Sequence, residues 1–210
     1  LLTHYPSEWT AAFLDKEPEN RKEAAISVAK SIGFSIESLN INTSGRVWEI
    51  SDNGKTLIQP LTSIKGLGEA AIAQIITNRP FNTIEEFLFH ENITYSKLNK
   101  KAIDVLVRSE ALDSLIDDRF KGRRHFWFTI AAERPRKEKN LAENIDKHAA
   151  FLQKAGGLEF KKEERIENLV SLTGMFPMHL VVSDDVLERL RDKYVPPVSE
   201  YDPELELVWF

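Results

Sequence analysis

The chain has 210 residues, of which 42% are hydrophobic and 29% are charged, and its formal net charge is -5. This length and composition predict a folded protein of one or two domains rather than a disordered chain. The acidic balance excludes a protein that coats nucleic acid with its whole surface, so a nucleic-acid site would have to be a local basic patch. The sequence has no cysteine, which excludes disulfides and thiolate metal sites and favours a cytoplasmic location.

The chain does not open like a secreted or membrane protein. No apolar run approaches the ~20 residues of a membrane helix. The first residues, LLTHYPSEW, resemble the end of a helix rather than a leader. We therefore expect a piece of a larger protein.

The N-terminal third is predicted to form two packed helices, over TAAFLDKE and NRKEAAISVAKSIGF, with Gly33 at the end of the second. The apolar residues at helical spacing on that second helix are Ala24, Ala25, Val28, Ala29 and Ile32. Next, RVWEI and KTLIQ flank an Asn-Gly pair, Asn53-Gly54. Asn-Gly between β-prone runs predicts one two-stranded hairpin with both central turn residues at positive φ.

The stretch SIKGLGEAAIAQII, Ser63 to Ile76, has the spacing of a helix-hairpin-helix. Gly66 allows a tight turn, Leu67 fills the space between two helices, and Gly68 opens the second helix with unpaired backbone N-H groups. These amides and the helix dipole form an anion site suited to a nucleic-acid phosphate, with Lys65 beside it. The alternative is that the glycine pair is only a tight loop.

A second, degenerate hairpin is predicted between Phe81 and Leu115. Asn82 or Thr83 can cap a helix over TIEEFLFH. A helix over KLNKKAIDVLVRSEAL would place Leu98, Ala102, Val105, Leu106 and Leu112 on one stripe. The turn between them would be Lys97-Leu98-Asn99-Lys100-Lys101, rich in lysine and without the glycines.

A basic segment follows, from Arg119 to Lys139, and its HFWF string is interpreted as core packing rather than as a platform for single-stranded bases. Arg123 and Arg124 would form a rim that faces solvent or phosphate. Further helices are predicted over ERIENLVSLTG, ending at Gly174, and over SDDVLERLRDK. Trp9, Trp48 and Trp127 are interpreted as core anchors.

Nothing in the sequence indicates a catalytic centre. Asp117-Asp118 and Asp184-Asp185 are adjacent pairs whose side chains point apart, which favours turn or cap roles over a two-metal site. The five histidines show no metal-ligand spacing. We assign no catalytic residue, metal or cofactor to this chain.

In order along the chain, HYPSEWTAAFL, NINTSGRVWEI, LTSIKGLGEAAIAQII, FNTIEEF, KLNKKAIDVLVRSEALDSL and ERIENLVSLTGMFP resemble the bacterial replicative DNA polymerase III α subunit, a C-family DNA polymerase. The closing DPELELVWF looks more like phage-encoded or divergent members. The resemblance implies a mainly α fragment with one β-hairpin and a tandem helix-hairpin-helix core.

The resemblance also implies a division of the chain. Residues 1–40 would end the fingers, 41–118 would hold the hairpin and the tandem helix-hairpin-helix, 119–160 would be a basic segment and linker, and 161–210 would lead toward an OB-fold. The parent would be a DNA-directed DNA polymerase whose catalytic aspartates and divalent metal ions lie in a palm domain outside this chain. The fragment itself would grip duplex DNA without catalysis.

Carried over by position, the DNA-binding residues would be Ser63, Ile64, Lys65, Gly66, Leu67 and Gly68 of the first hairpin and Lys97, Lys100 and Lys101 of the second. Two departures stand out. Glu110 replaces the usual glycine before DSL, so the cap of that helix is expected to differ. The glutamine-led clamp-binding peptide is missing, and its nearest equivalent is AGGLEF, Ala155 to Phe160.

Two alternatives remain open at this point. One is a free-standing helix-hairpin-helix module of a DNA-repair protein. The other is a protein-interaction module that docks a sliding clamp or another replisome subunit, in which the hairpin glycines are only structural.

Overall fold

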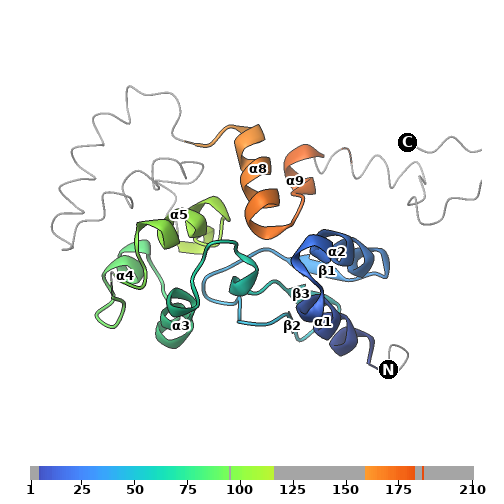
Figure 1. The fold of residues 1–210 in the computed structure, drawn as a ribbon, viewed down its shortest axis with the longest axis horizontal. Coiled ribbons are helices and arrows are strands. Elements are labelled where there is room, and N and C mark those ends of the chain that lie inside the picture. The colour runs from blue at the N-terminus through green and yellow to red at the C-terminus, as the bar shows by residue number, and fades with distance from the viewer. Residues whose placement is uncertain (1–4, 95, 116–158, 183–185, 187–210) are drawn as a thin grey trace, which may run out of the picture. The chain divides into compact units, whose positions relative to one another are not determined.

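The computed structural model describes residues 5–94, 96–115, 159–182 and 186. The chain divides into two compact units, Leu1–Met175 and Phe176–Phe210. The described part is mainly helical with one small sheet, which confirms the predicted fold class (Figure 1). In these residues no helix has both the length and the apolar character to cross a membrane.

The helices of the first unit are α1 Pro6–Lys16, α2 Lys22–Ser31, α3 Glu69–Asn78, α4 Ile84–Phe89, α5 Lys100–Arg108 and α8 Lys162–Thr173. Short 3-10 turns cover Glu19–Arg21, Leu61–Ser63 and Asp113–Leu115. The described part of the second unit contains α9 Met178–Val181. The HFWF string and the helix predicted from Ser183 lie outside the described residues, apart from Val186.

The two N-terminal helices pack together as predicted, but the buried face of α2 differs from the predicted stripe. Val28 and Ile32 are each 51% exposed. Ile26, which the stripe omitted, is buried in one hydrophobic cluster with Trp48 and Leu57. The helix is therefore rotated so that Ile26 rather than Val28 meets the sheet, a choice set by tertiary packing and not by spacing alone.

The tryptophans also agree only in part with their interpretation as core anchors. Trp48 is buried, as predicted. Trp9 is 38% exposed and stacks on Phe13 with 5.2 Å between ring centroids, so its interpretation as a core anchor was wrong. Trp127 lies outside the described residues.

The sheet has three strands, β1 Ser35–Glu37, β2 Glu49–Ile50 and β3 Thr56–Ile58, in the order β1-β3-β2. The antiparallel β2-β3 pair confirms the predicted hairpin. The parallel strand β1 was not predicted.

The turn of this hairpin differs from the predicted type. Gly54 has φ 67°, whereas Glu110 is the single non-glycine residue with positive φ in the described ranges, so Asn53 is not left-handed. Instead the Asn53 side-chain oxygen accepts hydrogen bonds from the amides of Lys55 and Thr56, at 2.8 and 2.9 Å. An Asx-type side-chain bond thus replaces the second positive φ.

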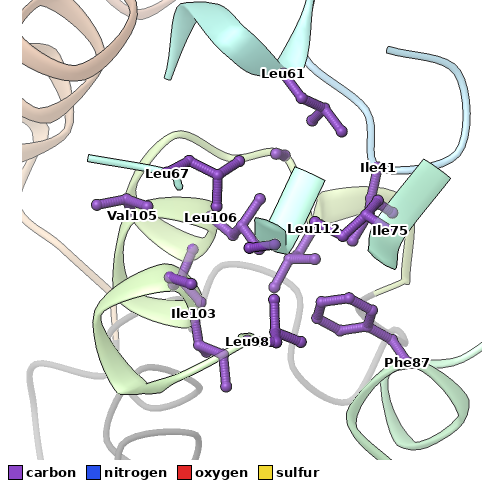
Figure 2. Packing of buried hydrophobic residues seen from close by; sticks show 14 of the residues in the cluster. Ile41, Leu61, Leu67, Ile75, Phe87, Leu98, Ile103, Val105, Leu106 and Leu112 are labelled. Atoms are coloured by element: carbon purple, nitrogen blue, oxygen red, sulfur yellow. The ribbon is translucent and has the colours of Figure 1, made fainter. Parts of the chain in front are cut away.

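A larger hydrophobic cluster lies among α3, α4, α5 and the loops that join them (Figure 2). Figure 2 shows Leu67 of the first loop, Leu98 of the second, and Leu106 of α5 in this cluster. Phe87 of α4 is fully buried there and meets Phe81 edge to face. The two helix pairs therefore share one core, as a tandem helix-hairpin-helix requires.

The two hairpins are equivalent from the leucine before each N-cap to the isoleucine four residues after it. A buried leucine precedes each N-cap: Leu67 before Gly68, and Leu98 before Asn99. Each N-cap carbonyl then accepts the amide of a buried isoleucine at 3.1 Å, Ile72 in α3 and Ile103 in α5. This equivalence supports the predicted degenerate second hairpin, although its connecting loop after α4 is longer.

The turn of the first hairpin depends on Gly66, which has φ 87°. This conformation lets Ile64 and Leu67, on either side of it, both be buried. A Cβ atom at Gly66 would lie 3.6 Å from Lys101 Cε and Val105 Cγ1, which is ordinary contact. The need for glycine is therefore a matter of backbone conformation and not of space.

Gly66→Ala should lower the free energy of unfolding by about 1–2 kcal/mol, because the left-handed region penalises a Cβ. Gly68→Ala is the matched control, since Gly68 has φ -74° and no atom lies within 4 Å of the position that a Cβ would occupy. It should change stability by less than about 0.5 kcal/mol, because a poorer N-cap and a less flexible unfolded chain offset each other. Denaturant unfolding measures both, and equal losses would contradict the assignment.

A hydrogen bond to Glu86 at the start of α4 should make the stability of the fold depend on pH. The backbone N-H of Asn82 donates to Glu86 Oε2 at 2.7 Å, and this bond is the largest cause that holds the pKa of Glu86 below its ordinary value. A lowered folded pKa means that the bond stabilises the fold above about pH 4.3, the unfolded pKa. This contribution is lost as the pH falls through the folded pKa. NMR titration should give Glu86 a lower pKa in the folded than in the denatured chain; equal values would contradict the bond.

Candidate nucleic-acid interface

The N-terminus of α3 presents backbone donors to solvent. Its N-cap, Gly68, has no side chain to cap the first turn. Within the described ranges, the amides of Gly68, Glu69 and Ala70 donate to no protein acceptor, and all three residues are exposed. Unpaired amides and the positive end of the helix dipole together attract an anion.

Lys65 has two roles in the same loop. Its side chain is exposed, as a phosphate contact requires. Its backbone N-H, however, donates to the carbonyl of Leu172 near the end of α8, at 2.9 Å. This amide is therefore satisfied inside the fold, and the donors available to a ligand begin after Lys65.

The second hairpin satisfies its helix terminus differently. Asn99 is the N-cap of α5, and its side-chain oxygen accepts the amide of Ala102 at 3.1 Å. Its first turn presents charge, because Lys97, Lys100 and Lys101 are all exposed. The first hairpin thus offers amides, and the second offers ammonium groups.

The two turns meet at Lys101. Its Cε atom lies 3.6 Å from the Cβ position that a side chain at Gly66 would occupy. The aliphatic stem of Lys101 therefore lies against the glycine turn of the first hairpin. One exposed lysine of each hairpin, Lys65 and Lys101, is thereby placed at the same loop.

Other predicted residues have their side chains inside the protein. Ile64 and Leu67 are core residues, and the Ser63 hydroxyl donates to the carbonyl of Pro60 at 2.7 Å. The backbone amides of these three residues also donate to carbonyls within the fold, so the residues shape the turn and do not supply free donors. Arg123 and Arg124 lie outside the described residues.

Sequence reasoning missed Arg46 at this site. Arg46 forms an ion pair with Glu69, the first residue of α3, and both side chains are about half exposed, at 49% and 62%. The pair balances the carboxylate of Glu69, which lies in the first turn of α3 beside the free amides. Nothing in the string SGRVWEI marks this arginine, because the contact joins segments far apart in sequence.

The string AGGLEF ends in the core. Phe160 is 8% exposed within the helix-hairpin-helix cluster, and the Arg108 guanidinium lies 5.3 Å from the centre of its ring. Residues 155–158 lie outside the described part. The aromatic side chain that a clamp would bind is thus already buried.

Histidine, aspartate and glutamate do not gather into a metal site in the described part of the chain: no group of three lies close enough to hold an ion. The candidate site therefore combines backbone amides and exposed lysines with the Arg46–Glu69 ion pair. The amides and lysines form an arrangement that attracts anions.

Comparisons with known proteins agree with this geometry. A family model described as a helix-hairpin-helix motif matches residues 33–122. The DNA polymerase III subunit alpha of Pseudomonas aeruginosa is 30% identical over 121 residues, which are 55% of this chain and 10% of the relative. The corresponding subunit of Vibrio cholerae is 30% identical over 119 residues, with the same shares.

The chain spans about a tenth of the length of the curated relatives that it matches. Both relatives are DNA polymerase III alpha subunits, and the motif match covers both hairpins and the sheet. The chain therefore carries a helix-hairpin-helix motif, and over about half of its length it is similar to bacterial DNA polymerase III alpha subunits.

Proposed function

We propose that this chain binds the phosphate backbone of duplex DNA as a non-catalytic part of a replicative DNA polymerase. The observation that carries the proposal is the exposed N-terminus of α3, with its unpaired amides at Gly68, Glu69 and Ala70. Lys101 lies against the adjacent turn from the second hairpin. Amides and lysines recognise phosphate without reading bases, so binding should not depend on sequence.

The expected binding site comprises the exposed first turns of α3 and α5 and the lysines around them, Lys65, Lys97, Lys100 and Lys101. Ser63, Ile64 and Leu67 would shape the turn, because their amides already donate to carbonyls within the fold. The surrounding protein carries a net negative charge, so affinity has to come from this local patch. Synthesis and its metal ions would belong to another part of the polymerase.

The rival functions have less support. A clamp-docking role through AGGLEF would require Phe160 to leave the core, where it is buried. A free-standing repair module would bind DNA in the same way, but the matched relatives are named as DNA polymerase III alpha subunits. The sliding clamp is therefore a secondary candidate partner.

Neutral replacement of the lysines tests the phosphate contacts. Lys65→Met and Lys101→Met should each weaken binding to a mixed-sequence duplex and make the plot of log affinity against log salt shallower by about 0.9. Lys30→Met is the matched control, because Lys30 is an exposed lysine of α2. Fluorescence anisotropy over a salt series gives both values. If Lys30→Met has the same effect, the patch is not the contact.

Capping the free amides tests the anion site itself. Gly68→Asn would recreate the cap of Asn99 and should stabilise the fold by up to about 1 kcal/mol relative to Gly68→Ala. It should nevertheless weaken DNA binding, because a side chain bonded to the Ala71 amide, as Asn99 is to that of Ala102, would cover the first turn beside the free amides of Gly68, Glu69 and Ala70. Relative to Gly68→Ala, the free energy of unfolding should therefore rise while the DNA affinity measured by anisotropy falls. DNA binding as tight as that of Gly68→Ala would show that these amides do not contact DNA.

A further inference from the structure

Glu110 occupies a backbone position that normally suits glycine. It has φ 61°, and its amide donates to the carbonyl of Val107 while the amide of Ala111 donates to that of Leu106, each at 3.1 Å. These two bonds form a Schellman motif at the end of α5 with glutamate in the left-handed position. Such a residue is kept only where its surroundings compensate for the strain.

The compensating contact comes from α8. Arg165 Nε lies 2.8 Å from Glu110 Oε1, and the two side chains are only 20% and 15% exposed. Beside this pair, Arg108 of α5 donates to the Asn168 side-chain oxygen at 3.3 Å. The strained cap of α5 is thus part of a polar contact that holds α8 against the second hairpin.

The other end of α8 meets the first hairpin. The carbonyl of Leu172 accepts the amide of Lys65 at 2.9 Å, and the carbonyl of Thr173 accepts the side-chain amide of Gln59 at 3.0 Å. The last carbonyls of a helix have no partner within the helix, so these bonds satisfy groups that would otherwise be unpaired. One helix therefore connects the end of α5 to the loop that carries Lys65 and Gly66.

We infer that Glu110 and Arg165 are positioning residues for DNA binding: their ion pair docks α8, and docked α8 fixes the turn of the first hairpin through the Lys65 amide. This inference rests on the proposed DNA-binding function. Neither side chain needs to touch DNA. The pair acts by reducing the freedom of a loop that would otherwise have to be ordered when phosphate binds.

Two variants test the inference because they change the charge in opposite directions. Arg165→Ala removes a positive charge, and Glu110→Gly removes a negative charge and also relieves the left-handed strain. Both should speed hydrogen exchange of the Lys65 amide by about 5- to 30-fold. Both should also weaken duplex binding by about fivefold or more. Arg165→Lys, which keeps the charge, should retain most of the affinity.

The salt dependence separates positioning from direct contact. If Arg165 touched phosphate, Arg165→Ala would reduce the salt slope by about 0.9, whereas a positioning residue should leave it unchanged. If charge alone mattered, Glu110→Gly would bind DNA more tightly. Unchanged Lys65 exchange, a reduced slope for Arg165→Ala, or tighter binding by Glu110→Gly would each overturn the inference.

The experiment also distinguishes the two proposals. Failure of the unmutated chain to bind duplex DNA would refute the proposed function, while Lys65 exchange would still report whether the ion pair fixes the turn. Exchange of the Ile75 amide in the core of α3 serves as the reference for global stability. If Arg165→Ala unfolds the chain, Glu110→Gly and Arg165→Lys still give the comparison.

Discussion

The loop from Ile64 to Gly68 has to bury two side chains while it keeps backbone donors at the surface. Ile64 and Leu67 both lie in the core, and the chain can reverse between them because Gly66 is left-handed. With those side chains inside, the amides that follow must face outward at the start of α3. The interior packing thus creates the exposed donors, and a change in the core would be felt at the site.

The two hairpins share this design but complete it with different chemistry. Gly68 leaves the first turn of α3 uncapped, whereas Asn99 caps α5 with its own side chain. The capped turn is more self-sufficient, and it carries Lys100 and Lys101 in place of Glu69 and Ala70. A single core therefore supports one helix start with free amides and another with exposed lysines, and as anion sites the two would differ in their sensitivity to geometry and to salt.

Much of this architecture could be predicted from local sequence. Gly174 ends α8 as expected, with φ 68°, and Thr83 caps α4 through its side chain. Strand β1 was missed because Ser35–Glu37 has a single apolar residue, and its pairing is parallel to a distant strand. Short strands of this kind form through tertiary contacts rather than through propensity.

The candidate site, too, was predictable only where local sequence marks it. The glycines and lysines of the two turns are visible as motifs, and Glu110 was recognisable as a departure from glycine. Its partner was not, because Arg165 lies 55 residues further along the chain and no local pattern connects them. The bond between the Lys65 amide and the Leu172 carbonyl could not be predicted for the same reason.

The bond between Gln59 and Thr173 spans 114 residues, so docking of α8 closes a long loop and carries its entropic cost. The helix-hairpin-helix core can form from contacts nearer in sequence, so we expect α8 to dock after that core and to be the first element of this unit to open locally.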